Sequence, residues 1–153
     1  MKIGVISDTH GLLRPQAVSA LADVDHILHA GDIGDLQILE NLRRIAPVTA
    51  IRGNVDTHRS FRHLPETEAV ELAGRIFYLI HDVKQLDLVP AVAGFSAVIS
   101  GHSHKPLIEW DKGVLFFNPG SAGPRRFSLP VSLGFLTIAN GQLHASTETL
   151  VVS

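Results

Sequence analysis

The sequence has 153 residues and no cysteine. The chain can therefore form no disulfide, no thiolate zinc site and no thiol nucleophile. Positive charge is not in excess either, since the formal net charge is −2. A protein without a basic surface gains little from a nucleic-acid backbone or an anionic membrane. We therefore expect no strong nucleic-acid patch and no membrane partner, and any phosphate must be met locally by metal ions and a few arginines.

Long hydrophobic runs are also missing. The longest apolar stretch, near residues 88–99, is too short to span a bilayer. Met1-Lys2 leads directly into an apolar run, which leaves no room for a signal peptide. The absence of cysteine fits a reducing compartment, so we expect a cytoplasmic protein. A chain of this length is most simply a single domain, 1–153, and the sequence leaves open whether it forms a homo-oligomer.

The first half of the sequence alternates strand and helix patterns. Strands are predicted at 3–6, 26–29 and 48–51, and helices at 15–21 and 35–44. This order implies parallel strands joined by right-handed crossovers.

The second half is richer in strand patterns. Hairpins are predicted at Ala73-Gly74, Asp111-Lys112-Gly113 and Asn140-Gly141, a strand at 97–99, and a short helix within 84–93. A parallel half followed by a hairpin half predicts an α/β fold of two sheets packed face to face, with helices outside.

Seven side chains that are typical metal ligands follow the predicted strands. They are Asp8, His10, Asp32, Asn54, His81, His102 and His104. Ligands of open α/β sheets bind beyond the carboxyl ends of strands, so one edge of the fold could gather all seven. Carboxylate, amide oxygen and imidazole together suit borderline first-row metals such as Mn, Fe, Zn or Co. Seven side chains exceed the needs of one ion and fit two ions that share a bridging carboxylate and keep water as their remaining ligands.

Some of these motifs have simpler interpretations when taken alone. Asp8 and His10 would share a face of an extended chain and could chelate one ion, but such a pair more often lies in a surface turn. Asp32 could cap the helix that begins near Asp35. Gly53-Asn54 could be a turn with the asparagine in a left-handed conformation.

The histidines favour the metal interpretation. His81 could be an ordinary histidine at a strand end, but His102 and His104 lie two residues apart directly after a strand, which is metal-ligand spacing. Five separate loops offer ligand-type residues at strand ends, and coincidence explains that poorly.

An ordered set of motifs resembles the signature of the calcineurin-like metallophosphoesterases. The motifs are Ser7-Asp8-Thr9-His10-Gly11, His29-Ala30-Gly31-Asp32, Arg52-Gly53-Asn54-Val55-Asp56, His81 and Gly101-His102-Ser103-His104. With Asn118-Pro119-Gly120-Ser121, the chain resembles more narrowly the small single-domain phosphodiesterases of that superfamily, from residue 3 to about 126. The resemblance implies a sandwich of two mixed β-sheets flanked by helices, with a dinuclear metal site at the strand ends.

The resemblance also implies how the ligands divide. Asp8, His10, Asp32 and His104 would bind one ion, and Asp32, Asn54, His81 and His102 the other, with Asp32 bridging. The cofactors would be two divalent ions, Mn foremost, with Fe, Zn, Ni and Co as alternatives. A hydroxide that bridges the ions would attack phosphorus in line. Asp8, Asp32 and Asn54 would be the catalytic residues, with Asn54 also a candidate contact to phosphate.

Two positions depart from the family pattern. Many members carry a histidine directly after the asparagine, where it helps catalysis, and this chain has Val55 there. His81 is followed by Asp82 where the family usually has glycine. Asp82 could orient a ligand or repel a phosphoryl group.

Further basic residues are candidates for substrate binding. Arg52 could contact a phosphate oxygen or form a rim salt bridge, and Arg125 and Arg126 could clamp substrate or belong to a solvated loop. His29 is predicted to be buried and hydrogen-bonded, not a ligand. His58 lies on a polar loop and is a candidate proton donor in place of the histidine that is absent at position 55.

The sequence thus predicts a hydrolase, a metal-dependent phosphodiesterase that acts on a small phosphodiester. A diester carries one negative charge fewer than a dianionic monoester, which suits a rim made acidic by Asp56 and Asp82. One alternative is a catalytically weak or inactive interaction scaffold, similar to the retromer subunit of this fold. Another is a phosphomonoesterase or protein phosphatase on the same metals. All seven ligand positions are filled, which argues against an inactive site.

Overall fold

Two five-stranded sheets make up the β-structure of the computed structural model, which describes residues 1–152. The first sheet has the order β10-β9-β1-β2-β3, from β1 (Lys2–Ile6), β2 (His26–His29), β3 (Val48–Ala50), β9 (Ser132–Ala139) and β10 (Gln142–Thr149). The second has the order β4-β5-β6-β8-β7, from β4 (Thr67–Leu72), β5 (Arg75–Ile80), β6 (Ala97–Ile99), β7 (Leu107–Asp111) and β8 (Val114–Asn118). Both sheets mix parallel and antiparallel pairs, which confirms the predicted fold class.

Each sheet contains a run of three mutually parallel strands. In the first sheet β1, β2 and β3 are parallel, and in the second β5, β6 and β8 are parallel. The three predicted hairpins are present as β4–β5, β7–β8 and β9–β10. The prediction of a second half built from hairpins was therefore incomplete. Six parallel strands, three in each sheet, have carboxyl ends at which ligands can be gathered.

Two of the hairpin turns show the backbone that their sequences predict. Ala73 and Asn140 have φ of 51° and 53°, and the glycine after each also has positive φ. Two consecutive positive φ values are the mark of the type I′ turn, whose twist matches that of paired strands.

The helices are short. They are α1 (Pro15–Ala20), α2 (Gln37–Arg43) and α3 (Pro90–Ala93), with 3₁₀ turns at Arg59–Phe61 and Val83–Gln85. The predicted helix within 84–93 is wrong as one element, because Pro90 disfavours helical geometry at the residue before it and Val89 is extended. No helix in the described part of the chain has the length and apolarity needed to cross a bilayer.

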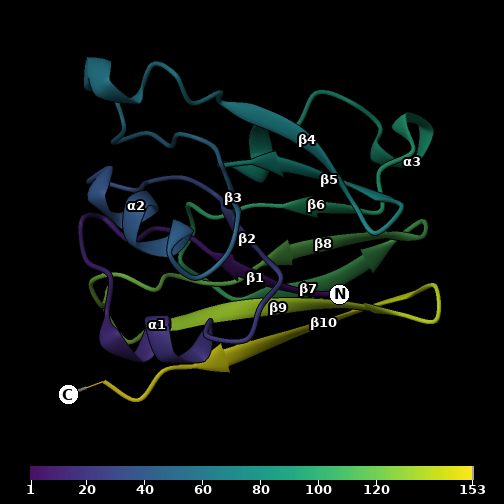
Figure 1. The fold of residues 1–153 in the computed structure, drawn as a ribbon. Helices are drawn as coiled ribbons and strands as arrows, with labels where there is room; N and C mark the ends of the chain where they lie inside the picture. Colours follow the sequence, from purple (N-terminus) through teal and green to yellow (C-terminus); the bar gives the residue numbers. More distant parts are fainter. Residues whose placement is uncertain (153) are drawn as a thin grey trace.

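The core lies in layers. Figure 1 shows the strands of the two sheets and the helices α1 and α2 outside them. Between the two sheets, side chains from β1, β5 and β8 interdigitate, among them Val5, Phe77 and Phe117. On the outer face of the first sheet, α1 buries Ala17 and α2 buries Leu39 and Leu42. The larger helices therefore lie outside the sandwich, as predicted, and leave the carboxyl ends of the parallel strands free of covering helices.

Asp56 joins two of the loops that leave those strand ends. Its side chain is almost fully buried and accepts hydrogen bonds from the backbone N–H groups of Ile33 (3.0 Å), Gly34 (3.0 Å) and Gly53 (2.8 Å). The loop after β2 is thereby fixed to the loop after β3. The expectation that Asp56 makes the rim acidic needs correction, because this carboxylate is turned inward and its oxygens face backbone donors.

We expect Asp56→Asn to lower the free energy of unfolding by about 3 kcal/mol, because an amide NH₂ cannot accept and leaves buried N–H groups without partners. Urea unfolding of protein freed of metal with a chelator measures the change in the free energy of unfolding. Asp35→Asn is the matched control, since Asp35 is exposed and caps Gln37 with a bond that asparagine also makes. Equal losses for both variants would contradict the assignment.

Candidate metal centre

Two buried carboxylates form the middle of the centre, and each is held by one of its oxygens. Asp8 Oδ2 accepts hydrogen bonds from the Ser7 hydroxyl (2.7 Å) and the His102 backbone N–H (3.1 Å). Asp32 Oδ1 accepts from the backbone N–H of Val55 (3.0 Å). The second oxygen of each carboxylate is thereby left to face the histidines.

Three imidazoles converge on these second oxygens. Asp8 Oδ1 lies 3.4 Å from His104 Nε2 and 3.8 Å from Nε2 of both His10 and His81. Asp32 Oδ2 lies 3.2 Å from His81 Nε2 and 3.6 Å from His10 Nε2. Five of the seven predicted ligands, from four different loops, are therefore within reach of shared ions.

The inward-facing atoms of this cluster lack hydrogen-bond partners. His81 Nδ1 lies 2.7 Å from the Ala30 carbonyl, so Nδ1 donates to that carbonyl and Nε2 faces the carboxylates. Asp8 Oδ1, His10 Nε2, His81 Nε2 and His104 Nδ1 are buried without a hydrogen-bond partner among the described residues. Buried polar atoms without partners are unfavourable unless a cation lies between them. The donor set therefore fits divalent metal ions.

The electrostatics of these side chains point the same way. Burial alone would raise the pKa of Asp32, but the His81 imidazole and the Val55 N–H lower it to about 2. Burial lowers the pKa of His81, and the contact with Asp32 more than offsets this, so that the pKa is raised overall. The carboxylate is thus ionised at neutral pH, and the site attracts positive charge.

The backbone is strained at the ligands. Asp8, His10, Asp32, His102 and His104 have φ of 56°, 45°, 55°, 70° and 61°. Such conformations cost of order 1–3 kcal/mol each in non-glycine residues and gather at functional sites. Asp8 and His10 therefore do not share a face of an extended chain, as their spacing suggested. Asn54 is not in this conformation, so the alternative interpretation of Gly53-Asn54 as a left-handed asparagine turn does not hold.

Two arrangements of shared ligands are compatible with these distances. Asp8 forms one cluster with His10 and His104 and a second with Asp32 and His81, so Asp8 is common to both. Asp32 Oδ2 also lies between His10 and His81, one from each predicted ion site. The bridging role of Asp32 stays a prediction.

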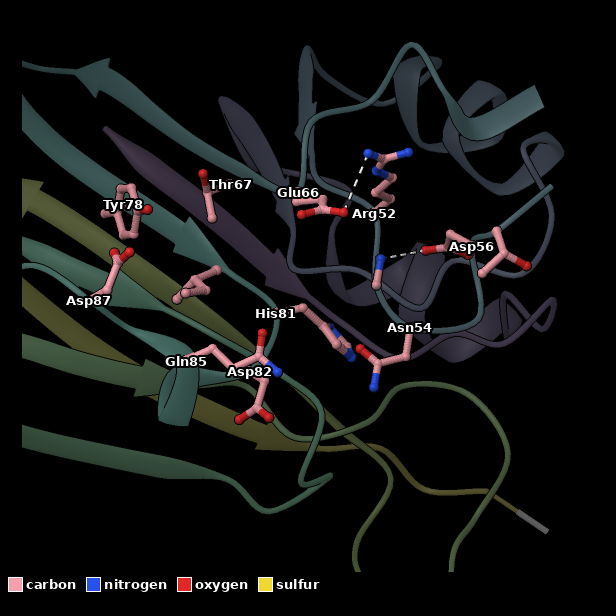
Figure 2. A pocket seen from close by; sticks show the side chains of 13 residues that line it. Arg52, Asn54, Asp56, Glu66, Thr67, Tyr78, His81, Asp82, Gln85 and Asp87 are labelled. Carbon is pink, nitrogen blue, oxygen red and sulfur yellow. Dashed lines mark hydrogen bonds and ion pairs between the residues drawn. The ribbon is translucent and has the colours of Figure 1, made fainter. Parts of the chain in front are cut away.

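Asn54 and His102 lie at the edge of the cluster. The Asn54 amide and the His81 ring point toward one another in Figure 2. The His102 side chain is about two-fifths exposed, and its Nε2 lies 3.8 Å from Asp82 Oδ2. Asp82 is thus placed beside a predicted ligand, which fits the orienting role suggested for it.

Hydrogen bonds from outside the ligand set position the loops. His29 is fully buried, and burial lowers its pKa to about 4, so it is neutral. Its Nδ1 accepts from the Gly31 N–H (3.1 Å) and its Nε2 lies 3.0 Å from the Thr9 hydroxyl, which donates to the Ile33 carbonyl. The prediction of a buried, hydrogen-bonded histidine is confirmed.

Asn118 and Ser121 hold the loop after β6 and the loop after β1. Asn118 Nδ2 donates to the Gly101 carbonyl (2.9 Å) and to Ser103 Oγ (3.1 Å), and Ser121 Oγ donates to the Asp8 carbonyl (3.0 Å). Neither residue had a predicted role beyond the family resemblance. Their position directly after the apolar run of β8 was the available signal.

The predicted substrate-binding arginines are not gathered at one place. Arg52 lines the cavity beside Asn54, and its guanidinium lies 3.4 Å from Glu66, the rim salt bridge that was the alternative. Arg125 and Arg126 are exposed on the loop before β9. His58 caps the 3₁₀ turn at Arg59–Phe61 by accepting from the Ser60 N–H.

An open cavity of about 590 Å³ adjoins the centre. His81 and Asn54 line one end of it, and Tyr78 and Asp87 lie away from them in Figure 2. This volume is in the range of small-molecule sites.

Comparison with known proteins places the chain in a family. The sequence model of the calcineurin-like phosphoesterase superfamily domain matches residues 1–141. A probable metallophosphoesterase of Methanocaldococcus jannaschii, MJ0623, is 38% identical over 134 residues, which are 79% of this chain and 68% of the relative. The phosphodiesterase MJ0936 of the same organism is 30% identical over 138 residues, which are 78% of this chain and 83% of the relative.

A solved structure shares the fold. Vps29 from Entamoeba histolytica, complexed with Zn²⁺, has a TM-score of 0.74 and 23% identity over 97% of this chain and 99% of the other. The matched residues 1–141 include all seven predicted metal ligands. The chain belongs to the calcineurin-like phosphoesterase superfamily.

Proposed function

We propose that this protein is a metal-dependent phosphodiesterase that hydrolyses a small phosphodiester. The observation that carries the proposal is the set of buried carboxylate and imidazole atoms without hydrogen-bond partners, which lies at one end of an open cavity. A relative at 30% identity is named a phosphodiesterase, which supports diester chemistry.

Asp8, His10, Asp32, Asn54, His81, His102 and His104 would hold two divalent ions, Mn foremost. Such ions, when bound, supply Lewis-acid charge for phosphoryl oxygens and lower the pKa of water. The protein itself holds the ligand side chains in place. Asp8 and Asp32 are fixed by hydrogen bonds through one oxygen each, and the Ala30 carbonyl fixes the His81 tautomer. Asn54 is exposed at the cavity edge, where its amide can contact a phosphate oxygen.

The structure gives the scaffold alternative no specific support. Vps29 structures share the fold at less than 25% identity, which bears on architecture alone. A surface used only for protein binding would have no need of buried acceptors, left-handed ligand backbone and a cavity beside them.

The first prediction concerns Asp32. Asp32→Asn should reduce bound metal below two ions per chain and lower the rate by at least about 100-fold, since the change removes charge that a shared ligand supplies to both ions. Elemental analysis and hydrolysis of a chromogenic diester measure these effects. Asp35→Asn, three residues away and exposed, is the control. At most one ion in metal-replete wild type would refute the dinuclear site.

The second prediction concerns the two arginines on the loop before β9. Arg125→Ala/Arg126→Ala should raise KM by more than it lowers kcat, because a contact made equally in the ground state and transition state affects binding alone. Steady-state kinetics with a chromogenic diester test this. Arg43→Ala, on the exposed side of α2, controls for loss of surface charge. Unchanged kinetics would assign the pair to a solvated loop.

The third prediction concerns substrate class and rests on Val55, which cannot donate a proton to a leaving alkoxide. A positioned acid contributes about 10²–10⁴-fold, so aryl diesters should be cleaved faster than alkyl diesters. We also expect diester turnover to exceed monoester turnover, because Asp82 keeps the rim acidic even though Asp56 does not contribute.

Wild type, Val55→His and His58→Ala are compared on one aryl diester, one alkyl diester and one aryl monoester. Val55→His should narrow the gap between aryl and alkyl leaving groups. His58→Ala should have little effect, since His58 is occupied as a cap. Faster monoester turnover by wild type would refute the diesterase assignment.

A further inference from the structure

The cavity beside the metal centre is acidic beyond the ligands. Glu66, Asp82 and Asp87 contribute to its lining, and the one basic side chain there, Arg52, is paired with Glu66. Asp82 accepts a hydrogen bond from the Lys84 backbone N–H and lies 3.8 Å from His102 Nε2. Asp87, in contrast, has no lysine, arginine or histidine nitrogen within 4.0 Å in the described part of the chain. The part of the cavity at Asp87 therefore carries negative charge that no basic side chain of the described residues pairs with.

The cavity runs along β5, away from the centre. Tyr78 and Ile80 alternate onto its lining face, and His81 follows at the end of the strand. Three residues of strand correspond to about 10 Å, so Tyr78 is about that far from His81 along the chain. The Tyr78 ring is stacked on Phe95 with centroids 4.9 Å apart, which leaves one aromatic face fixed in place.

His81 shows which end of the cavity takes the phosphate. It is 5% exposed, it lines the cavity, and its Nε2 has no hydrogen-bond partner among the described residues. In Figure 2 the side chains of Asp82, Asp87 and Tyr78 lie on one side of His81, so a ligand at His81 can extend along them.

We propose that this cavity binds one ester substituent of the substrate and selects a substituent that carries a cationic ammonium group. The inference rests on the proposed phosphodiesterase function. An ammonium gains from Asp82 and Asp87 and from the aromatic face of Tyr78. A second phosphate in the same place meets three carboxylates and only one paired guanidinium. The substrate class is therefore zwitterionic phosphodiesters of amino alcohols, and not nucleotides or polyphosphates.

The kinetic test compares 4-nitrophenyl 2-aminoethyl phosphate with 4-nitrophenyl propyl phosphate, which differ only in the terminal group. We expect wild-type kcat/KM to favour the amino ester by about tenfold at low salt, and the preference to shrink as salt rises. Asp82→Asn/Asp87→Asn should bring the ratio close to one. Asp111→Asn is the control. Asp111 lies on the edge strand β7 of the second sheet and does not line the cavity, so this variant should keep the wild-type ratio.

A binding test separates this inference from the proposed function. Calorimetry of the metal-loaded protein uses (3-aminopropyl)(methyl)phosphinate and butyl(methyl)phosphinate, whose phosphinate groups carry one negative charge and have two P–C bonds in place of hydrolysable ester bonds. Tighter binding of the amino compound supports the inference even if no diester is cleaved. Hydrolysis of both esters at equal rates, with equal phosphinate affinities, overturns the inference and leaves the phosphodiesterase assignment standing.

Discussion

Two buried carboxylates with their free oxygens turned toward imidazole nitrogens are the constraint on which the rest of the structure depends. Asp8 and Asp32 are almost fully buried, and no donor among residues 1–152 satisfies Asp8 Oδ1. Buried charge of this kind is costly unless it is paired. The fold tolerates it because a bound cation would compensate both carboxylates, so stability and metal affinity are linked at this site.

Rigidity around the carboxylates comes from side chains that do not bind metal. Asp56, Asn118 and His29 each accept or donate bonds that fix a ligand loop through its backbone. Close packing adds to this. A Cβ at Gly101 would lie 2.1 Å from Ser7 Oγ, so only glycine allows the loop after β6 to approach Asp8. The left-handed backbone at five ligands is held by this network, since the conformations would otherwise relax.

The charge distribution connects the centre with substrate choice. Negative charge at Asp8 and Asp32 faces inward and would be offset by bound ions, whereas Asp82 and Asp87 face the cavity. Asp82 belongs to both regions, because it lies next to His81 in the chain and near His102 in space. An acidic residue at this position can therefore affect a ligand and a substrate at once.

The sequence by itself determined which residues could bind metal and the broad architecture. Strand ends followed by ligand-type residues were visible in the pattern of Asp8, Asp32, His81 and His104, because side-chain chemistry and apolar runs are local properties. The parallel order of β1, β2 and β3 followed from the alternation of strands and helices.

Only the tertiary structure decided how these pieces meet. The parallel pairing of β5, β6 and β8 is non-local, and nothing in each apolar run specifies its partner. The inward turn of Asp56 and the left-handed ligand backbone also depend on contacts between distant loops, which override local spacing. Packing in three dimensions also decided that Arg52 pairs with Glu66 and that acidic side chains line a cavity. A sequence gives the charge of each side chain, but only the fold gives the groups that this charge faces.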